Sequence, residues 1–355
     1  MFPMQPPLDT RGTPDGDRHQ WIEEGAYEVA KGVYRIPLPL PFDGLRAVNT
    51  YAIEVDGGLI MIDSGWVLEE TKDQLERSLA RIGAGLGDIR RFLITHIHRD
   101  HYTQAIALRK IFGMKIALGE GEKQSLDVML GRDFGLLTAR GERLAIAGAQ
   151  PLIEKMIEAG MRRPDGDQGY DEPDEWIASG QKFELGTRTL EAIATPGHTH
   201  GHVVFADYSA GLLFAGDHVL PHITPSISLE AAPQELPLRD FLDSLLLVRQ
   251  MPDLVLLPAH GPVAPSVHAR ADELIDHHDQ RLRVIAAELA CGPRTAYEVA
   301  LAVRWTSKNR KLTDLDLINQ TLAVGETEAH LDLIVARGQA SAFLDGGVRL
   351  YRLVG

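Results

Sequence analysis

The stretch Thr95-His96-Ile97-His98-Arg99-Asp100-His101 places three histidines and one aspartate directly after the apolar run at 92–94. Alternate side chains of an extended segment point the same way, so His96 and His98 can reach one metal ion together. Asp100 and His101 then open a helical pattern and can turn toward a second ion. With 14 histidines in 355 residues, this histidine spacing arises by chance only ~0.02 times per chain. The spacing therefore favours a metal site over a cluster of surface polar residues.

Three further residues of metal-ligand type stand at the ends of later apolar runs. His198 follows the strand predicted at 189–195, Asp217 ends the strand at 212–217, and His260 ends the strand at 254–260. Sheets of α/β proteins place their sites at the carboxyl ends of strands, so we expect these side chains to meet residues 96–101. Neutral imidazole and carboxylate ligands suit zinc, and also iron or manganese.

This ligand pattern resembles the metallo-β-lactamase superfamily over residues 28–262. The resemblance implies an α/β fold, the αββα four-layer sandwich, and two divalent metal ions, with zinc preferred to iron or manganese. It implies that one ion is bound by His96, His98 and His198, that the other is bound by Asp100, His101 and His260, and that Asp217 bridges them. Asp100 and Asp217 are then the catalytic residues.

Two residues beside the ligands are expected to support them. Asp63, in the run LIMIDSG, matches the acidic residue that the family places beside its metal loop. It could accept a hydrogen bond from the second ring nitrogen of a histidine ligand. Thr199 could steady His198 or its loop.

The resemblance is closest to glyoxalase II-like hydrolases, which carry a bridging carboxylate like Asp217. It implies that a hydroxide bridging the two ions cleaves a small ester, thioester or lactone, and an acyl thioester is our first choice. The family often continues its motif as DHxGG, whereas this chain reads Asp100-His101-Tyr102-Thr103-Gln104. That departure leaves the fine substrate class open.

Two alternative functions remain at this stage. An endoribonuclease or phosphodiesterase of the same fold is one, because a winged-helix tail behind this fold resembles the arrangement in β-lactamase-like endoribonucleases. A non-catalytic metal-binding regulatory protein is the other. The complete ligand set argues against the second alternative, because a decayed site usually loses some ligands.

The apolar pattern divides the chain into three parts. Residues 1–20 are expected to form a flexible arm, 21–264 the catalytic domain, and 265–355 a mostly helical, winged-helix-like domain with a terminal hairpin. Residues 120–178 show helical patterns without a strand period, which predicts a helical insertion near the cleft. On the long helix predicted at 266–290, His277 and His278 are expected to be solvated, and Cys291 after it is expected to pack.

The net charge of the chain indicates which kinds of binding partner to expect. The net charge is −14, and residues 265–355 carry 11 Lys and Arg against 12 Asp and Glu, a net of −1. An acidic surface disfavours a nucleic-acid partner, although it does not exclude a local basic patch, and Arg294, Arg304, Lys308, Arg310 and Lys311 form a basic cluster. We expect a small-molecule substrate, self-association as a homodimer, and no membrane partner. One cysteine and the lack of a secretory signal at residues 1–20 favour the cytoplasm.

Overall fold

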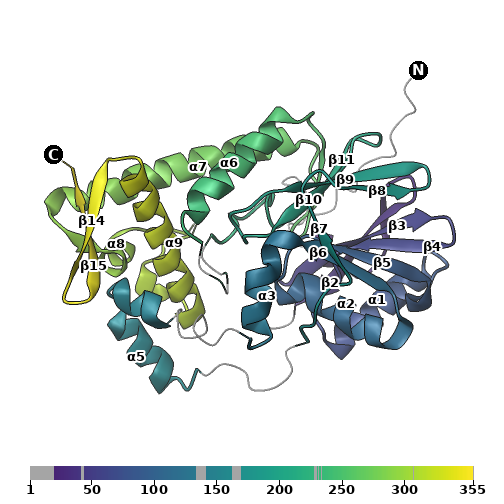
Figure 1. Ribbon diagram of the computed structural model, residues 1–355, viewed down its shortest axis with the longest axis horizontal. Helices are drawn as coiled ribbons and strands as arrows, with labels where there is room; N and C mark the ends of the chain where they lie inside the picture. The colour runs from purple at the N-terminus through teal and green to yellow at the C-terminus, as the bar shows by residue number, and fades with distance from the viewer. Residues whose placement is uncertain are drawn as a thin grey trace.

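The computed structural model describes residues 20–40, 44–132, 141–161, 169–227, 230, 232, 234–306 and 308–354. The flexible arm expected at 1–20 therefore lies outside the described residues, except for Gln20, which begins the short 3-10 helix η1 (Gln20–Ile22). Three sheets and their covering helices make up the rest (Figure 1).

The first sheet has seven strands in sequence order. They are β1 (Tyr27–Ala30), β2 (Val33–Pro39), β3 (Ala47–Val55), β4 (Gly58–Ile62), β5 (Ile89–Ile94), β6 (Lys115–Gly119) and β7 (Glu175–Ile177). Strands β1 to β4 pair antiparallel, and β4 to β7 pair parallel. A turn at Asp56 and Gly57 joins β3 to β4, and Gly57 has a φ of 82° that suits glycine.

The second sheet has five strands in the order β12-β11-β10-β9-β8. They are β8 (Lys182–Leu185), β9 (Arg188–Ala194), β10 (Val203–Asp207), β11 (Leu212–Gly216) and β12 (Val255–Pro258). All pairs are antiparallel except β11 with β12, which are parallel because α6 (Pro237–Gln250) crosses between them. The carboxyl ends of β11 and β12 therefore meet at one edge.

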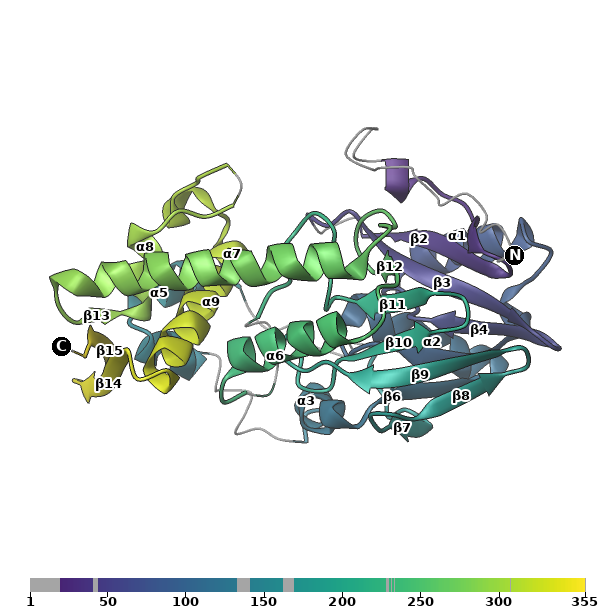
Figure 2. The same cartoon turned by 90° about the horizontal axis from the view of Figure 1, so that it is seen from above.

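The two sheets stack face to face, and helices cover both outer faces (Figure 2). Alternation along the strands explains this. Phe92 and Ile94 of β5 pack with the helices α1 (Glu69–Ala80) and α2 (Arg99–Phe112), whereas Leu93 packs between the sheets. In β11, Phe214 lies between the sheets and Leu213 lies under α6. The αββα four-layer sandwich predicted from the sequence is therefore confirmed.

The carboxyl-terminal region is mostly helical. Its elements are α7 (Val267–Glu288), η4 (Leu289–Cys291), β13 (Arg294–Thr295), α8 (Ala296–Ala302), η5 (Leu312–Asp314), α9 (Leu317–Ala336), β14 (Ala340–Asp345) and β15 (Val348–Leu353). The three strands form a separate sheet in the order β13-β15-β14. Helix α7 has 22 residues, so it spans about 33 Å and runs from its contact with α6 to its contact with α9 (Figures 1 and 2). One apolar core continues from the second sheet into this region.

Three expectations were wrong. Residues 120–178 hold η3 (Glu120–Glu122), α3 (Lys123–Met129) and α5 (Gln150–Glu158), but they also contain β7, which is too short to show a period and is held by parallel pairing with β6. His278 is not solvated but 0% exposed, because its face of α7 packs against α9. Cys291 does not pack but is exposed, after α7 has ended. Among the described residues, no helix is both long and apolar enough to cross a membrane.

Candidate metal centre

All the predicted ligands lie just beyond the carboxyl ends of strands. Strand β5 leads into His96 and His98, and α2 begins immediately after, so that Asp100 lies in its first turn. A carboxylate is favourable there because the helix dipole is positive at that end. His198 follows β9, Asp217 directly follows β11 and His260 follows β12. The structure brings all seven side chains together in two adjoining groups.

The first group contains His96, His98, His198 and Asp217, with ligand atoms all within 4.8 Å of one another. His98 Nδ1 lies 3.0 Å from His96 Nε2 and 3.1 Å from His198 Nε2. Two nitrogens that share a tetrahedral zinc ion at the usual bond length are about 3.3–3.4 Å apart, so this spacing fits one shared ion. Burial lowers the pKa of His98 to about 3 and that of His96 well below its usual value, which keeps both imidazoles neutral.

The second group contains Asp100, His101 and His260. Asp100 Oδ2 is 3.6 Å from His101 Nε2 and 3.5 Å from His260 Nε2. Within the described residues, these two buried Nε2 atoms have no hydrogen-bond partner. Leaving such atoms unsatisfied is costly, and a divalent ion would satisfy both. Burial lowers the pKa of His101, but the carboxylates of Asp100 and Asp63 outweigh it and raise this pKa to about 10, so the surroundings favour a cation.

Asp217 faces both groups. Its Oδ2 lies 3.5 Å from His198 Nε2 in the first group, and its Oδ1 lies 3.4 Å from His260 Nε2 in the second. Burial raises the pKa of Asp217, but His260 and His101 outweigh it and hold this pKa well below its usual range, so the carboxylate is ionised. One side chain with an oxygen toward each group has the geometry of a bridging ligand.

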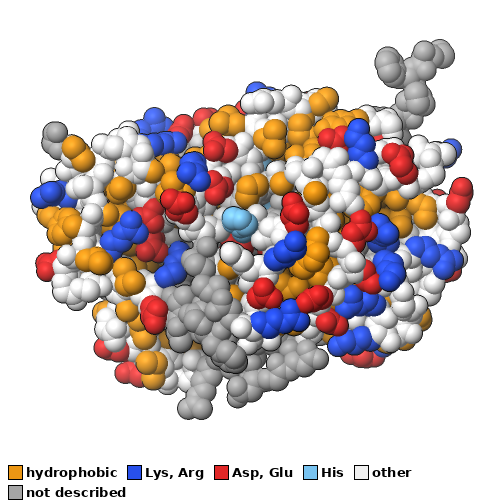
Figure 3. Space-filling model, viewed as in Figure 1, with side chains coloured by type: hydrophobic (Ala, Val, Ile, Leu, Met, Phe, Trp, Pro, Cys, Tyr) orange, Lys and Arg blue, Asp and Glu red, His pale blue; other side chains and the backbone are white. Residues whose placement is uncertain are grey.

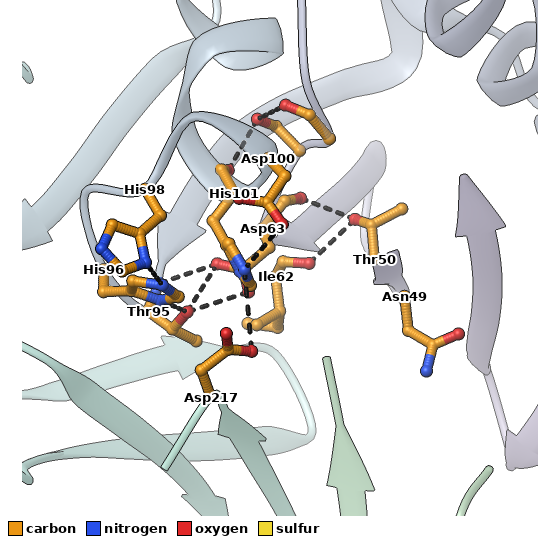
Figure 4. Close-up of polar contacts among 12 residues, drawn as sticks. Asn49, Thr50, Ile62, Asp63, Thr95, His96, His98, Asp100, His101 and Asp217 are labelled. Carbon is orange, nitrogen blue, oxygen red and sulfur yellow. Dashed lines mark hydrogen bonds and ion pairs between the residues drawn. The ribbon is translucent and has the colours of Figure 1, made fainter. Parts of the chain in front are cut away.

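Asp63 connects the end of β4 to the ligand loop (Figure 4). Its Oδ2 accepts a hydrogen bond from His101 Nδ1 at 2.8 Å, and its Oδ1 accepts one from the backbone N–H of Thr95 at 2.8 Å. The Thr95 hydroxyl also contacts His96 Nδ1 at 3.0 Å. Asp63 has a left-handed φ of 58°, which aspartate and asparagine tolerate better than most residues. It thus takes the orienting position expected from the sequence.

We expect Asp63→Asn to weaken metal binding by about 10–100-fold, because it removes the negative charge that orients His101 while keeping the shape and the backbone conformation. Competition with a chromophoric chelator measures the affinity. Asp56→Asn is the control, because Asp56 is an exposed aspartate in the β3–β4 turn. Equal affinities of the two variants would contradict the orienting role.

Thr199 contacts a residue that the sequence analysis did not identify. Its hydroxyl donates to the carboxylate of Glu122, which also accepts a hydrogen bond from the backbone N–H of Ile97 at 3.3 Å. Glu122 is fully buried, and burial together with Glu230 raises its pKa to about 8. Glu122 therefore joins the His96–His98 loop to the His198 loop. Glu122 lies in the segment 120–178, which was interpreted as an insertion, so the sequence did not predict this role.

His202 supports the first group from behind. Its Nε2 accepts a hydrogen bond from the backbone N–H of Asp217 at 3.1 Å, and its ring stacks on that of His96 with centroids 5.1 Å apart. A Cβ on Gly216 would lie 2.7 Å from His202 Nε2 and from Thr95 Cβ, so only glycine permits this approach. His202 therefore supports the first group without belonging to it, and His218 nearby in the sequence is also fully buried.

Comparisons with known proteins agree with this geometry. The family model of the metallo-beta-lactamase superfamily matches residues 43–260. The chain is 27% identical to a metallo-beta-lactamase family protein from Thermus thermophilus, with a TM-score of 0.76 over 92% of this chain and 100% of that one. It is also 27% identical to a beta-lactamase domain protein from Burkholderia ambifaria, with a TM-score of 0.75 over 93% of each chain.

Two curated relatives carry names that describe an activity. The probable metallo-hydrolase YqjP of Bacillus subtilis is 24% identical over 91% of this chain and 98% of its own length. An atrochrysone carboxyl ACP thioesterase of Aspergillus fumigatus is 30% identical over 70% of this chain and 46% of its own length. The first similarity covers nearly the whole length of both chains, whereas the second covers less than half of the fungal protein.

Proposed function

This chain belongs to the metallo-beta-lactamase superfamily, a family of metallo-hydrolases, and we propose that it hydrolyses a small ester, thioester or lactone at a dinuclear metal centre. The observation that carries this proposal is Asp217, whose two oxygens face two separate groups of metal-ligand side chains. A single ion could not be bound by both groups of ligands at the same time.

The donor set fits two divalent ions, with zinc preferred to iron or manganese. His96, His98 and His198 would hold the first, Asp100, His101 and His260 the second, and Asp217 both. Ions bound there would polarise a substrate carbonyl and lower the pKa of a water molecule toward ~7.

The protein groups around the ions would divide the remaining work. Burial raises the pKa of Asp100, but His101 and His260 outweigh it and lower this pKa, so its carboxylate stays ionised and would accept a hydrogen bond from the attacking water. Asp63 fixes the ring orientation of His101 through its hydrogen bond to Nδ1. Neutral His202 holds the backbone of Asp217 in place.

A thioester is the first candidate substrate within this class. The fungal relative named as a thioesterase supports it. The segment 120–178 contributes to the site through Glu122, which contacts Thr199 beside His198. Tyr170, near the other end of the segment, lies against Tyr102 of α2 with ring centroids 6.2 Å apart. We propose that this segment shapes substrate preference.

We also propose that residues 265–355 form a winged-helix-like module that serves packing, cleft shaping or dimerisation. The order α7-β13-α8-α9-β14-β15 and the β13-β15-β14 sheet support this assignment. On the face seen in Figure 3, acidic and basic side chains are interspersed over the module rather than gathered by sign. Within the basic cluster named above, Arg294 is already paired with Glu288 at 2.9 Å.

We expect the wild-type protein to hydrolyse at least one substrate in a panel of model esters, thioesters and lactones, and the His96→Ala variant to be inactive on it. The reason is that His96 supplies one of the three nitrogens of the first group. Initial rates for both proteins, purified in parallel, are the measurement. Equal turnover would show that the activity does not come from this centre.

The nuclease alternative has one observation in its favour, the four exposed basic residues Arg304, Lys308, Arg310 and Lys311 between α8 and α9. Phosphate contacts give a log–log salt slope of about −0.7 per contact on single strands. Inactivity on the whole panel, with metal-dependent RNA cleavage and with RNA binding that has a steep salt slope and is lost on replacing Arg310 and Lys311, would establish the nuclease in place of our proposal.

A further inference from the structure

A second set of metal-ligand side chains lies outside the centre described above. Among the described residues, His278, Glu326 and His330 are the remaining group whose ligand atoms all lie within 4.8 Å of one another. His278 comes from α7, and Glu326 and His330 are four residues apart on one face of α9, which packs against α7 (Figure 1). Both histidines are 0% exposed.

The two imidazoles have the spacing of ligands that share an ion. His278 Nδ1 lies 3.2 Å from His330 Nε2. The ligand nitrogens of the first group at the main centre are 3.0 and 3.1 Å apart, and a tetrahedral zinc ion would set about 3.3–3.4 Å. The α7–α9 pair therefore shows the same close approach of imidazole nitrogens as the main centre.

The orientation of His330 also matches that of a ligand. Its Nδ1 donates a hydrogen bond to the backbone carbonyl of Glu326 at 2.7 Å, which leaves the lone pair on Nε2 facing His278. His198 and His260 are oriented in the same way, by the carbonyls of Ser226 and Ala47. Metal-binding histidines characteristically donate their second ring nitrogen to such a partner. Burial lowers the pKa of His330 to about 3, so the ring is neutral.

The surroundings leave a carboxylate that the protein alone does not satisfy. The Glu326 carboxylate receives no hydrogen bond from the described residues, and its ligand atom lies within 4.8 Å of those of both histidines. Arg281, one turn along α7 from His278, is directed elsewhere: its guanidinium stacks 4.0 Å over the Trp305 ring, and its Nη1 donates to the carbonyl of Arg304. Within the described residues, no ion pair within 4.0 Å joins Arg281 to Glu326. Burial raises the pKa of Glu326, and the charge of Arg281 opposes that rise only in part.

We propose that His278, Glu326 and His330 bind a divalent transition-metal ion, zinc in the first instance, which fastens α7 to α9. Two imidazoles and one carboxylate are ligands that suit zinc, and three protein ligands leave a fourth position for water. This site shares no ligand with the dinuclear centre. On the side of His278, the Phe241 ring lies 5.5 Å from that of His278 and 5.3 Å from that of the buried His218. The competing explanation is a hydrogen bond from His278 Nδ1 to His330 Nε2 with no ion.

The metal content of the full-length chain, dialysed in dilute zinc and analysed by plasma mass spectrometry, separates the two explanations. We expect the wild type to hold about one ion more than His330→Ala and about one more than Glu326→Gln. His277→Ala is the matched control, because His277 is the exposed neighbour on the same helix, and it should keep the wild-type content. Hydrolysis by all three variants should stay at the wild-type level, because none of these residues belongs to the main centre.

A second measurement uses the double variant His96→Ala/His101→Ala, in which the main centre is disabled. Zinc should still raise its unfolding temperature, and adding Glu326→Gln should remove that rise. Equal metal content in wild type, His330→Ala and Glu326→Gln would overturn the proposal and leave the hydrogen-bonded pair. If His330→Ala does not fold, Glu326→Gln alone decides, because it keeps the side-chain shape and breaks no hydrogen bond of the described residues. Loss of this site would leave the proposed dinuclear centre untouched.

Discussion

Replacing Asp217 by alanine is expected to lower kcat by about 10³-fold or more while changing KM little. Polarisation by a metal ion contributes several kcal/mol to transition-state stabilisation, and each 1.36 kcal/mol changes the rate about tenfold. Asp217 is the one described side chain whose carboxylate faces both ligand groups, through Oδ2 toward His198 and Oδ1 toward His260. Without Asp217, the second ion would have fewer ligands, and no carboxylate would hold the first ion beside it. The effect should therefore fall on kcat, because the interaction acts in the transition state.

Steady-state kinetics on the best substrate of the panel, with metal analysis of the same preparations, would test this expectation. Asp243→Ala is the matched control, because Asp243 is an exposed aspartate on α6, which belongs to the same αββα sandwich. It should behave as the wild type does. An Asp217→Ala variant with kcat within a few-fold of wild type would show that Asp217 does not bridge two ions.

Removing metal should abolish the activity, and restoring zinc should return it. We expect the main centre to hold about two ions, measured as the difference in metal content between the wild type and the His96→Ala/His101→Ala variant. The physical reason is that His101 Nε2, His260 Nε2 and Asp217 Oδ1 are buried without hydrogen-bond partners among the described residues. Ions that bind only the folded chain also stabilise it, by about 4 kcal/mol at a thousand times the dissociation constant. Chelation should therefore lower the unfolding temperature as well.

The measurements are elemental analysis, activity and thermal unfolding before and after dialysis against a chelator, then after adding zinc, iron or manganese. The ion that restores most activity identifies the preferred metal. The His96→Ala/His101→Ala variant should show no recovery with any of them. Full activity of the metal-free protein, or the same metal content in the double variant as in wild type, would contradict the dinuclear proposal.

The ligand pattern and its resemblance to the metallo-β-lactamase superfamily were sufficient to predict the sandwich and the ligand positions. Apolar alternation in β5 and β11 placed one side of each strand against helices and the other against the second sheet. The ligand types at strand ends, His198, Asp217 and His260, indicated a common edge because such ends converge in this kind of sheet. The structure brought all of them together with His96–His101.

Other residues of the site had no local signal. Glu122 looked like any acidic residue at the start of a helical segment, yet it joins two ligand loops through Ile97 and Thr199. Strand β7 has only three residues, and it is held in place by parallel pairing with β6. His278 was expected to be exposed, because it lies in a charged and polar run of α7. In the structure it is buried on the face of α7 that packs on α9.

The sequence by itself determined the ligand types, their order and the THIHRDH spacing, because these are properties of neighbouring residues, and the resemblance of that pattern to the metallo-β-lactamase superfamily implied the layered fold. Only the tertiary structure decided the distances within and between the two ligand groups, and that His278 meets Glu326 and His330. Those relations join residues that are tens to more than a hundred positions apart. Their distances are set by how the sheets stack and how α7 crosses α9, and both depend on the packing of the whole core.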